Sequence, residues 1–274
     1  MKILRKTVRR IAIISILVAV ALFLVIMPFY ITSPDLDYIL VIAFTVAVLP
    51  PSIANIIHSR WKNKIEKATP QFLRDLSTSF KTGMPLFTAL EHAAKRNYGP
   101  LTIELKLMVS QMSWGMNFND ALIAFSKRID LPLIRKSTVL ILEAGRHGGD
   151  LSDIFDSTAK YVDNVNAWTN KRRTQTLPYV AIFYFSVIIF LFIIILVSSM
   201  IFMPMSQIAE AGSALITPIL TPIMARRVFL HTALLEALFG GILAGKIHED
   251  SFLGGLKHAT VLAIISGLAF YIFF

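Results

Sequence analysis

Long apolar runs constrain the fold of this chain more than any other feature of its sequence. Five stretches are predominantly apolar, at residues 11–31, about 36–57, 177–203, about 228–244 and 252–274. As a helix, the first would reach roughly 30 Å, the thickness of one bilayer core, and it is too long for the apolar region of a typical signal peptide. Only 16% of all residues are charged, whereas soluble domains carry about a quarter. The sequence therefore predicts an all-α integral membrane protein with about five transmembrane helices.

The distribution of positive charge predicts how these helices are oriented. The chain has a net charge of +10, and 23 of its 27 basic residues lie in residues 1–10 and 58–176. Lys and Arg concentrate on the cytoplasmic side of membrane proteins. We therefore expect a multi-pass protein of the cell membrane whose N-terminus and 58–176 block are cytoplasmic and whose C-terminus is outside. The basic residues are mixed with acids or flank spans, so we expect lipid membrane as a partner and no nucleic acid.

Three domains follow from these boundaries. Residues 1–57 are predicted to hold a basic N-terminus and two transmembrane helices, with Pro50–Pro51 kinking or ending the second. Residues 58–176 are predicted to form a cytoplasmic six-helix bundle domain. Residues 177–274 are predicted to hold three further transmembrane helices, with an outer loop at 204–226.

Glycines, prolines and capping residues mark the six helices of the 58–176 block. Thr69 and Pro70 suit the start of the first helix, and Asp150 suits the start of the sixth. No helix breaker follows Asp150 before Pro178, so we expect the sixth helix to continue into the third span as one long helix. The intervening boundaries are predicted at Gly83–Pro85, Gly99–Pro100, Gly115–Asn117 or Asn119, Pro132 and Gly145.

The glycine-rich stretch "GRHGGD" at 145–150 is the most conspicuous candidate for chemistry. A phosphate-binding loop requires a Lys-Ser/Thr pair after its glycines, but here Asp150 and Leu151 follow. An aspartate at the anion position would also repel a phosphate. The pattern instead predicts a helix stop followed by a helix start. Gly148 or Gly149 would take the left-handed conformation, and Asp150 would accept a hydrogen bond from the backbone of Ser152 or Asp153.

Other reactive residues do not assemble into a recognisable site. The chain has no cysteine, and its six histidines lack the i, i+4 spacing of a metal-binding helix. We therefore expect no catalytic residue, cofactor or metal, and no enzyme activity. Glu236 is the exception, because an acid in the middle of a span is costly and is usually paired or functional. It is expected to pair with a polar group on another span or to face a substrate or partner. The alternative function is thus a membrane transporter or an intramembrane enzyme that uses Glu236.

Three stretches in register resemble one known family. Residues 72–95, 113–129 and 140–162 resemble the type II secretion F domain found in the platform proteins of type IV pili, type II secretion, Tad pili and the archaellum. Residues 240–259 resemble the archaeal branch, with Asp250 standing where glycine is usual. The matching turn or candidate partner-contact residues are Gly83, Gly115, Asp120, Glu143, Gly145, Gly148, Gly149 and Asp150.

The resemblance implies a membrane platform that takes part in protein secretion or in pilus or archaellum assembly. Its implied partners are a cytoplasmic hexameric secretion ATPase and pilin or archaellin subunits. The archaellum platform usually has two cytoplasmic domains, whereas this chain has one, so a homodimer or pairing with a second platform subunit is expected. The role of Glu143 stays open at this point: its carboxylate could brace the turn or face the ATPase.

Overall fold

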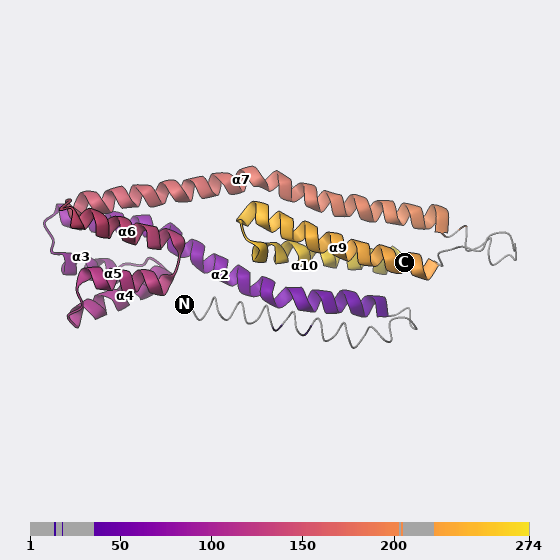
Figure 1. Ribbon diagram of the computed structural model, residues 1–274, viewed down its shortest axis with the longest axis horizontal. Helices are drawn as coiled ribbons and strands as arrows, with labels where there is room; N and C mark the ends of the chain where they lie inside the picture. Colours follow the sequence, from indigo (N-terminus) through magenta and orange to yellow (C-terminus); the bar gives the residue numbers. More distant parts are fainter. Residues whose placement is uncertain (1–13, 15–17, 19–35, 203, 205–221, 274) are drawn as a thin grey trace. The chain divides into compact units, whose positions relative to one another are not determined.

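Every regular element in the described part of the chain is a helix. The computed structural model describes residues 14, 18, 36–202, 204 and 222–273. Residues Ile57–Arg172 form one compact unit, and the described residues before Ile57 and from Arg173 onward form a second. The helices are α2 (Leu36–Lys81), α3 (Leu86–Lys95), α4 (Pro100–Ser113), α5 (Phe118–Ile129), α6 (Pro132–Arg146), α7 (Leu151–Val197), the π-helix η1 (Ser198–Phe202), α9 (Pro222–Glu249) and α10 (Phe252–Phe273) (Figure 1).

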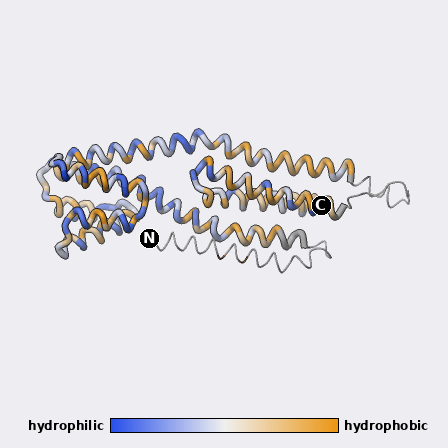
Figure 2. Tube along the Cα trace, in the orientation of Figure 1, coloured by the Kyte–Doolittle hydropathy of each residue, from blue (hydrophilic) through white to orange (hydrophobic). Residues whose placement is uncertain are grey.

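Four helices in the described residues are long and apolar enough to cross a membrane. They cover Val41–Lys81, Leu151–Ile201, Met224–Glu249 and Phe252–Phe273, and the apolar segments of α7, α9 and α10 are evident in Figure 2. The chain is therefore an all-α, multi-pass membrane protein. Apart from Ile14 and Val18, the predicted span at 11–31 lies outside the described residues, as do the basic N-terminus and most of the 204–226 loop. The loop was predicted to extend to residue 226, but α9 already begins at Pro222.

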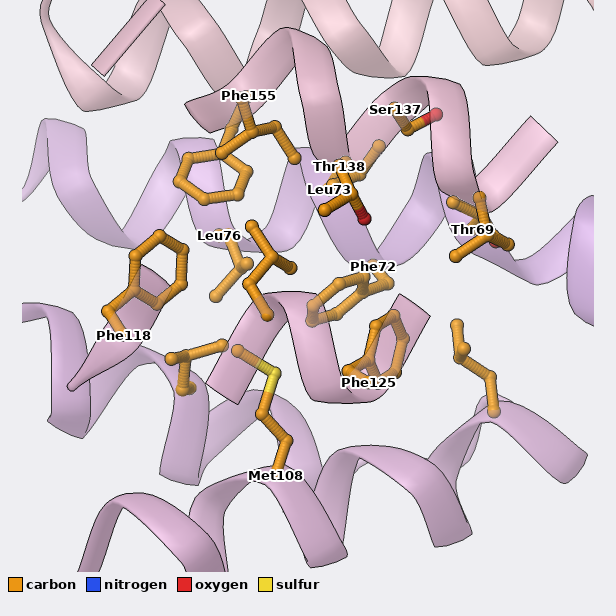
Figure 3. Close-up of a pocket in the computed structure, with 15 residues that line it drawn as sticks. Thr69, Phe72, Leu73, Leu76, Met108, Phe118, Phe125, Ser137, Thr138 and Phe155 are labelled. Carbon is orange, nitrogen blue, oxygen red and sulfur yellow. The ribbon is translucent and has the colours of Figure 1, made fainter. Parts of the chain in front are cut away.

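The unit at Ile57–Arg172 is built from the end of α2, helices α3 to α6 and the start of α7. Apolar residues recur at helical spacing on each of these segments and meet in one core. A cavity of about 20 Å³ lies inside this core. Apolar side chains and the hydroxyl-bearing Thr69, Ser137 and Thr138 line it (Figure 3). A cavity of this volume holds at most about one water molecule, so it is far too small for a nucleotide. Fully buried core residues include Ile65, Leu76, Leu90, Leu101, Leu105, Met108, Ile129 and Phe155.

Prolines in α2 do not end the helix. This excludes an end at Pro50–Pro51 and corrects the prediction that Thr69 and Pro70 begin a helix. The helix continues through Pro50–Pro51 and through Pro70 as a single element, so Thr69 is not an N-cap. Thr69 instead donates its hydroxyl to the Ile65 carbonyl at 2.8 Å within the same helix. Proline fixes a φ that is itself helical, so its main penalties are a lost hydrogen bond and steric crowding.

The hydrogen bond lost at Pro70 is replaced from a distant helix. Pro70 has no N–H to donate to Glu66, whose carbonyl lies four residues earlier. Asn166 of α7 donates its side-chain Nδ2 to that carbonyl at 2.9 Å. Because the orphaned acceptor is satisfied in this way, α2 remains intact across Pro70.

Replacing Asn166 with alanine is expected to lower the free energy of unfolding by about 1–2 kcal/mol, the penalty of leaving a shielded carbonyl without a donor. Alanine at position 70 restores the backbone N–H. The Asn166→Ala penalty should therefore shrink by about 1 kcal/mol in the Pro70→Ala background, as a double-mutant cycle would measure. Asn164→Ala, at an exposed position on the same helix, serves as the control. Equal Asn166→Ala penalties in the two backgrounds would contradict this explanation.

Helices α9 and α10 form an antiparallel hairpin with unusually close backbones. A Cβ added to Gly245 would lie 2.1 Å from the Cα of Gly255, and one added to Gly241 would lie 2.4 Å from the Cα of Ala259. Glycine is required where two backbones approach this closely. The residues of the 240–259 stretch therefore serve helix packing.

The turn of this hairpin is shorter than the sequence indicated. Lys246, Ile247 and His248 are still helical, and only Asp250 and Ser251 separate α9 from α10. Asp250 adopts a positive φ of 53°, the left-handed conformation that glycine takes at no steric cost. Its carboxylate accepts from Lys246 Nζ at 2.6 Å. Aspartate thus occupies the backbone conformation that glycine would supply.

Candidate functional site

Three of the predicted glycines end helices in the same way. Gly83, Gly115 and Gly148 follow α2, α4 and α6, and their φ angles are +77°, +92° and +75°. Left-handed glycine just past a helix end is the signature of the Schellman motif. Of the two glycines proposed for the left-handed position in the 145–150 stretch, Gly148 occupies it. These residues are therefore helix stops.

The hydrogen bonds that define the motif are present at all three turns. In each, the residue after the glycine donates its N–H across the turn to a carbonyl five residues earlier, and the glycine donates to a carbonyl three residues earlier. These bonds satisfy carbonyls that the helix end leaves unpaired. The longer bonds join Met84 to Ser79 at 3.1 Å, Met116 to Gln111 at 3.2 Å and Gly149 to Ala144 at 3.2 Å.

Capping side chains start the next helix after two of the turns. Asn117 Oδ1 accepts from the Asp120 N–H at 2.8 Å, and Asn117 Nδ2 donates to the Asp120 carboxylate at 2.6 Å. Asp150 Oδ1 accepts from the Ser152 N–H at 2.8 Å. Ser152 is one of the two donors predicted for this cap. Asn117 and Asp150 therefore cap α5 and α7, and Asp120 pairs with the Asn117 cap.

The three turns converge on one aromatic side chain. Phe155, in the first turns of α7, lies 5.3 Å from the Phe80 ring near the end of α2 and 6.5 Å from the Phe118 ring at the start of α5. Figure 3 shows Phe155 and Phe118 among the side chains that line the core cavity. The turns at 82–85, 114–117 and 147–150 thus share one end of the unit, which we call the three-turn end.

Residues beside the 147–150 turn differ in how much room surrounds them. A Cβ on Gly149 would lie 3.1 Å from Ile154 Cδ1 and 3.2 Å from the Ala144 carbonyl, whereas one on Gly145 would meet nothing within 4 Å.

Glu143 is 56% exposed, and its carboxylate lies 3.5 Å from Arg146 Nη1. An ion pair this loose and exposed adds little stability. The Glu143 carboxylate is therefore accessible to a partner, and its role stays a prediction.

An exposed apolar stripe on α4 was not anticipated from the sequence. Ile103 and Leu107 of α4 are exposed, and so is Trp114, the capping residue directly after its last turn, which is 88% exposed. The signal was present, because these positions are separated by four and seven residues and therefore share one helical face. It was obscured by the stripe at residues 101, 105, 108 and 112, which packs inward. We call Ile103, Leu107 and Trp114 the α4 stripe; it reaches the three-turn end at Trp114.

Charged side chains inside the unit join its helices. Arg128 of α5 donates through Nε to Glu104 at 2.9 Å and through Nη1 to Gln111 at 2.9 Å. Tyr98 donates its hydroxyl to Asp75, and burial together with the Asp75 carboxylate raises the pKa of Tyr98 above its ordinary value. Tyr98 therefore remains a protonated donor. No group of three metal-ligating side chains occurs within the described residues.

Glu236 lies in α9 and meets a polar group on another span. Ser186 of α7 donates its hydroxyl to Glu236 Oε1 at 2.8 Å. The other carboxylate oxygen, Oε2, is buried and has no hydrogen-bond partner among the described residues. The hydrogen bond from Ser186 thus satisfies one of the two carboxylate oxygens.

Comparison with known proteins identifies the region that carries the turns. Residues 72–198 match the family model described as type II secretion system (T2SS), protein F. This stretch, less than half of the chain, is similar to a type II secretion system F domain, and we call it the F domain. The domain includes all three glycine turns and continues along α7, and its family comprises membrane platform proteins of secretion and pilus-type systems.

A relative extends the similarity beyond the F domain. An uncharacterized protein of Methanocaldococcus jannaschii is 29% identical over 227 residues, which cover 81% of this chain and 36% of the relative. The matched region is thus only about a third of that relative's length. No solved structure matches the chain.

Proposed function

We propose that this chain is the cell-membrane platform of a pilus-like assembly machine, a pilus or an archaellum, and that it couples a cytoplasmic secretion ATPase to the assembly of pilin or archaellin subunits. The observation that carries the proposal is an F domain in a chain with several membrane helices. In this proposal the N-terminus and residues 58–176 face the cytoplasm, and the C-terminus lies outside.

The architecture of the F domain suits the transmission of force. Its turns are short, and α7 is one helix of 47 residues that contains both F-domain core residues and an apolar span. Such a helix is roughly 70 Å long. A displacement applied where α7 begins would act on the same helix that enters the bilayer.

The three-turn end is the surface we assign to the ATPase. It presents the Glu143 carboxylate and the exposed Trp114 ring. Tryptophan is among the residues that contribute most to binding at protein interfaces. The F domain would also pair with a second copy of the chain or with a second platform subunit.

Removal of the gene tests the proposed function directly. Cells that lack it should assemble no filaments, and the intact gene supplied in trans should restore them, as counted by electron microscopy. Co-purification of the membrane-extracted chain with the secretion ATPase of the same organism tests the partner. Normal filament numbers without the gene would overturn the proposal.

Replacing Trp114 with alanine should leave the unfolding temperature nearly unchanged, because the side chain is 88% exposed. It should weaken ATPase binding about tenfold, a loss within the range for an interface tryptophan, as measured by titration of the detergent-solubilised chain. Trp168→Ala is the matched control: that tryptophan is 68% exposed on α7, away from the three-turn end. If the two substitutions weaken binding equally, this assignment of the surface is wrong.

A further inference from the structure

An open groove runs between α7 and α9 within the membrane-spanning segments. Its rims are apolar, and the side chains of Ile189, Ile193, Leu235 and Phe239 are exposed there. Two hydroxyls and one carboxylate interrupt this apolar lining. The groove is lined by Ser186, Ile189, Phe190 and Ile193 of α7 and by Thr232, Leu235, Glu236 and Phe239 of α9.

Glu236 lies near the middle of its membrane span. The span that contains it covers Met224–Glu249, so its Cα is roughly 18 Å along the helix from either end. Lipid headgroups and water do not reach this depth of a bilayer. A partner for the carboxylate must therefore come from protein groups that lie within the membrane.

The polar groups that line the groove satisfy only one carboxylate oxygen. Ser186 donates its hydroxyl to Oε1 at 2.8 Å. Thr232 donates its hydroxyl to the Val228 carbonyl at 2.8 Å. Within the part of the chain that the structure describes, Oε2 is buried and accepts no hydrogen bond, and a buried acceptor in that state costs free energy.

We propose that the groove receives a transmembrane helix of a partner protein, and that this helix presents a lysine or another hydrogen-bond donor to the Glu236 carboxylate near its midpoint. Lipid chains fit the apolar rims but carry no donor at this depth. A helix satisfies its own backbone and so brings a polar side chain to mid-membrane. The inference follows from the groove and its carboxylate and does not depend on the proposed function.

The absence of cysteine from the chain allows a direct test. The full-length chain is reconstituted in phosphatidylcholine vesicles with a single cysteine at Leu243→Cys, which lies two turns from Glu236 on the same face of α9. Two synthetic Leu/Ala helices are added. Each carries two cysteines, one two turns before its centre and one two turns after it. They differ only in having lysine or leucine at the central position. Disulfide yield measures occupancy.

The lysine helix should crosslink roughly three- to tenfold more than the leucine helix, as the strength of hydrogen bonds between membrane helices implies. The preference should disappear in Glu236→Leu, and its unfolding temperature in detergent confirms that this variant is folded. Glu236→Gln, which is isosteric, should show a reduced preference. A chain with its cysteine at Leu268→Cys, exposed on α10, should show no preference.

Three results would overturn the inference. Equal crosslinking of the two helices would show that no donor is recognised. A preference that survives Glu236→Leu would assign recognition to other residues. Crosslinking between two copies of the chain at position 243 that excludes both helices would make the groove an interface between copies of this protein.

Discussion

Substitution of Gly245 by alanine is expected to separate α9 from α10 and to lower the free energy of unfolding by about 3 kcal/mol or more, the upper end of the overpacking range. The added Cβ would lie 2.1 Å from both the Cα and the N of Gly255. These are backbone atoms, so no side-chain rotation relieves the clash. The helices would have to move apart and would lose contacts along the whole hairpin.

A glycine on the same helix provides the matched control for Gly245. A Cβ on Gly240 would meet only Phe183 Cδ1, at 3.9 Å. Gly240→Ala should therefore be neutral or should stabilise the chain by up to about 1 kcal/mol, because alanine favours helix over glycine. Equilibrium unfolding of both variants in mild detergent separates the two effects. Equal stability of the two variants would contradict the close approach at Gly245.

Substitution of Gly148 by valine is expected to cost about 2 kcal/mol, since a β-branched residue is strained in the left-handed conformation. The φ of Gly148 is +75°, while the space around its missing Cβ is empty. The penalty thus arises from the backbone and not from crowding. Asparagine, which tolerates this conformation better, should cost less. Filament assembly should fall with Gly148→Val if the three-turn end contacts the ATPase.

Gly145→Ala is the control at the same turn. Gly145 is helical with open space around it, so alanine should raise the free energy of unfolding by up to about 1 kcal/mol. Calorimetric titration of the purified chain with ATP should show no binding to either variant or to the unmodified chain. If Gly145→Ala destabilises the chain as much as Gly148→Val does, the left-handed turn is not the cause of the penalty.

Local signals predicted the F domain well. The stops at Gly83 and Gly115, the caps at Asn117 and Asp150, and the long α7 all agree with the structure. Each depends on the conformation of a few adjacent residues or on hydrogen bonds across one turn. Such preferences act within a short segment, so they are readable without knowledge of the rest of the fold.

The features that were not predicted correctly from the sequence depend on contacts between distant segments. Pro70 was expected to begin a helix, but Asn166, far along the chain, satisfies the carbonyl that this proline leaves free. The exposed α4 stripe was overlooked because α4 is apolar on two faces, and local periodicity does not identify which face is covered. Packing against neighbouring helices decides both outcomes.

The membrane-helix class, the turn chemistry and the F-domain resemblance are thus readable from the sequence alone, because apolar length and backbone preference are local properties. Other features depend on the assembled helices: the continuity of α2, the contact of Gly245 with Gly255, and the unpaired Oε2 of Glu236. Each of these requires two segments that are separated in the chain to meet at defined atoms. Hydrophobic patterning indicates which faces can be buried, but only tertiary packing decides which of them are covered and which atoms touch.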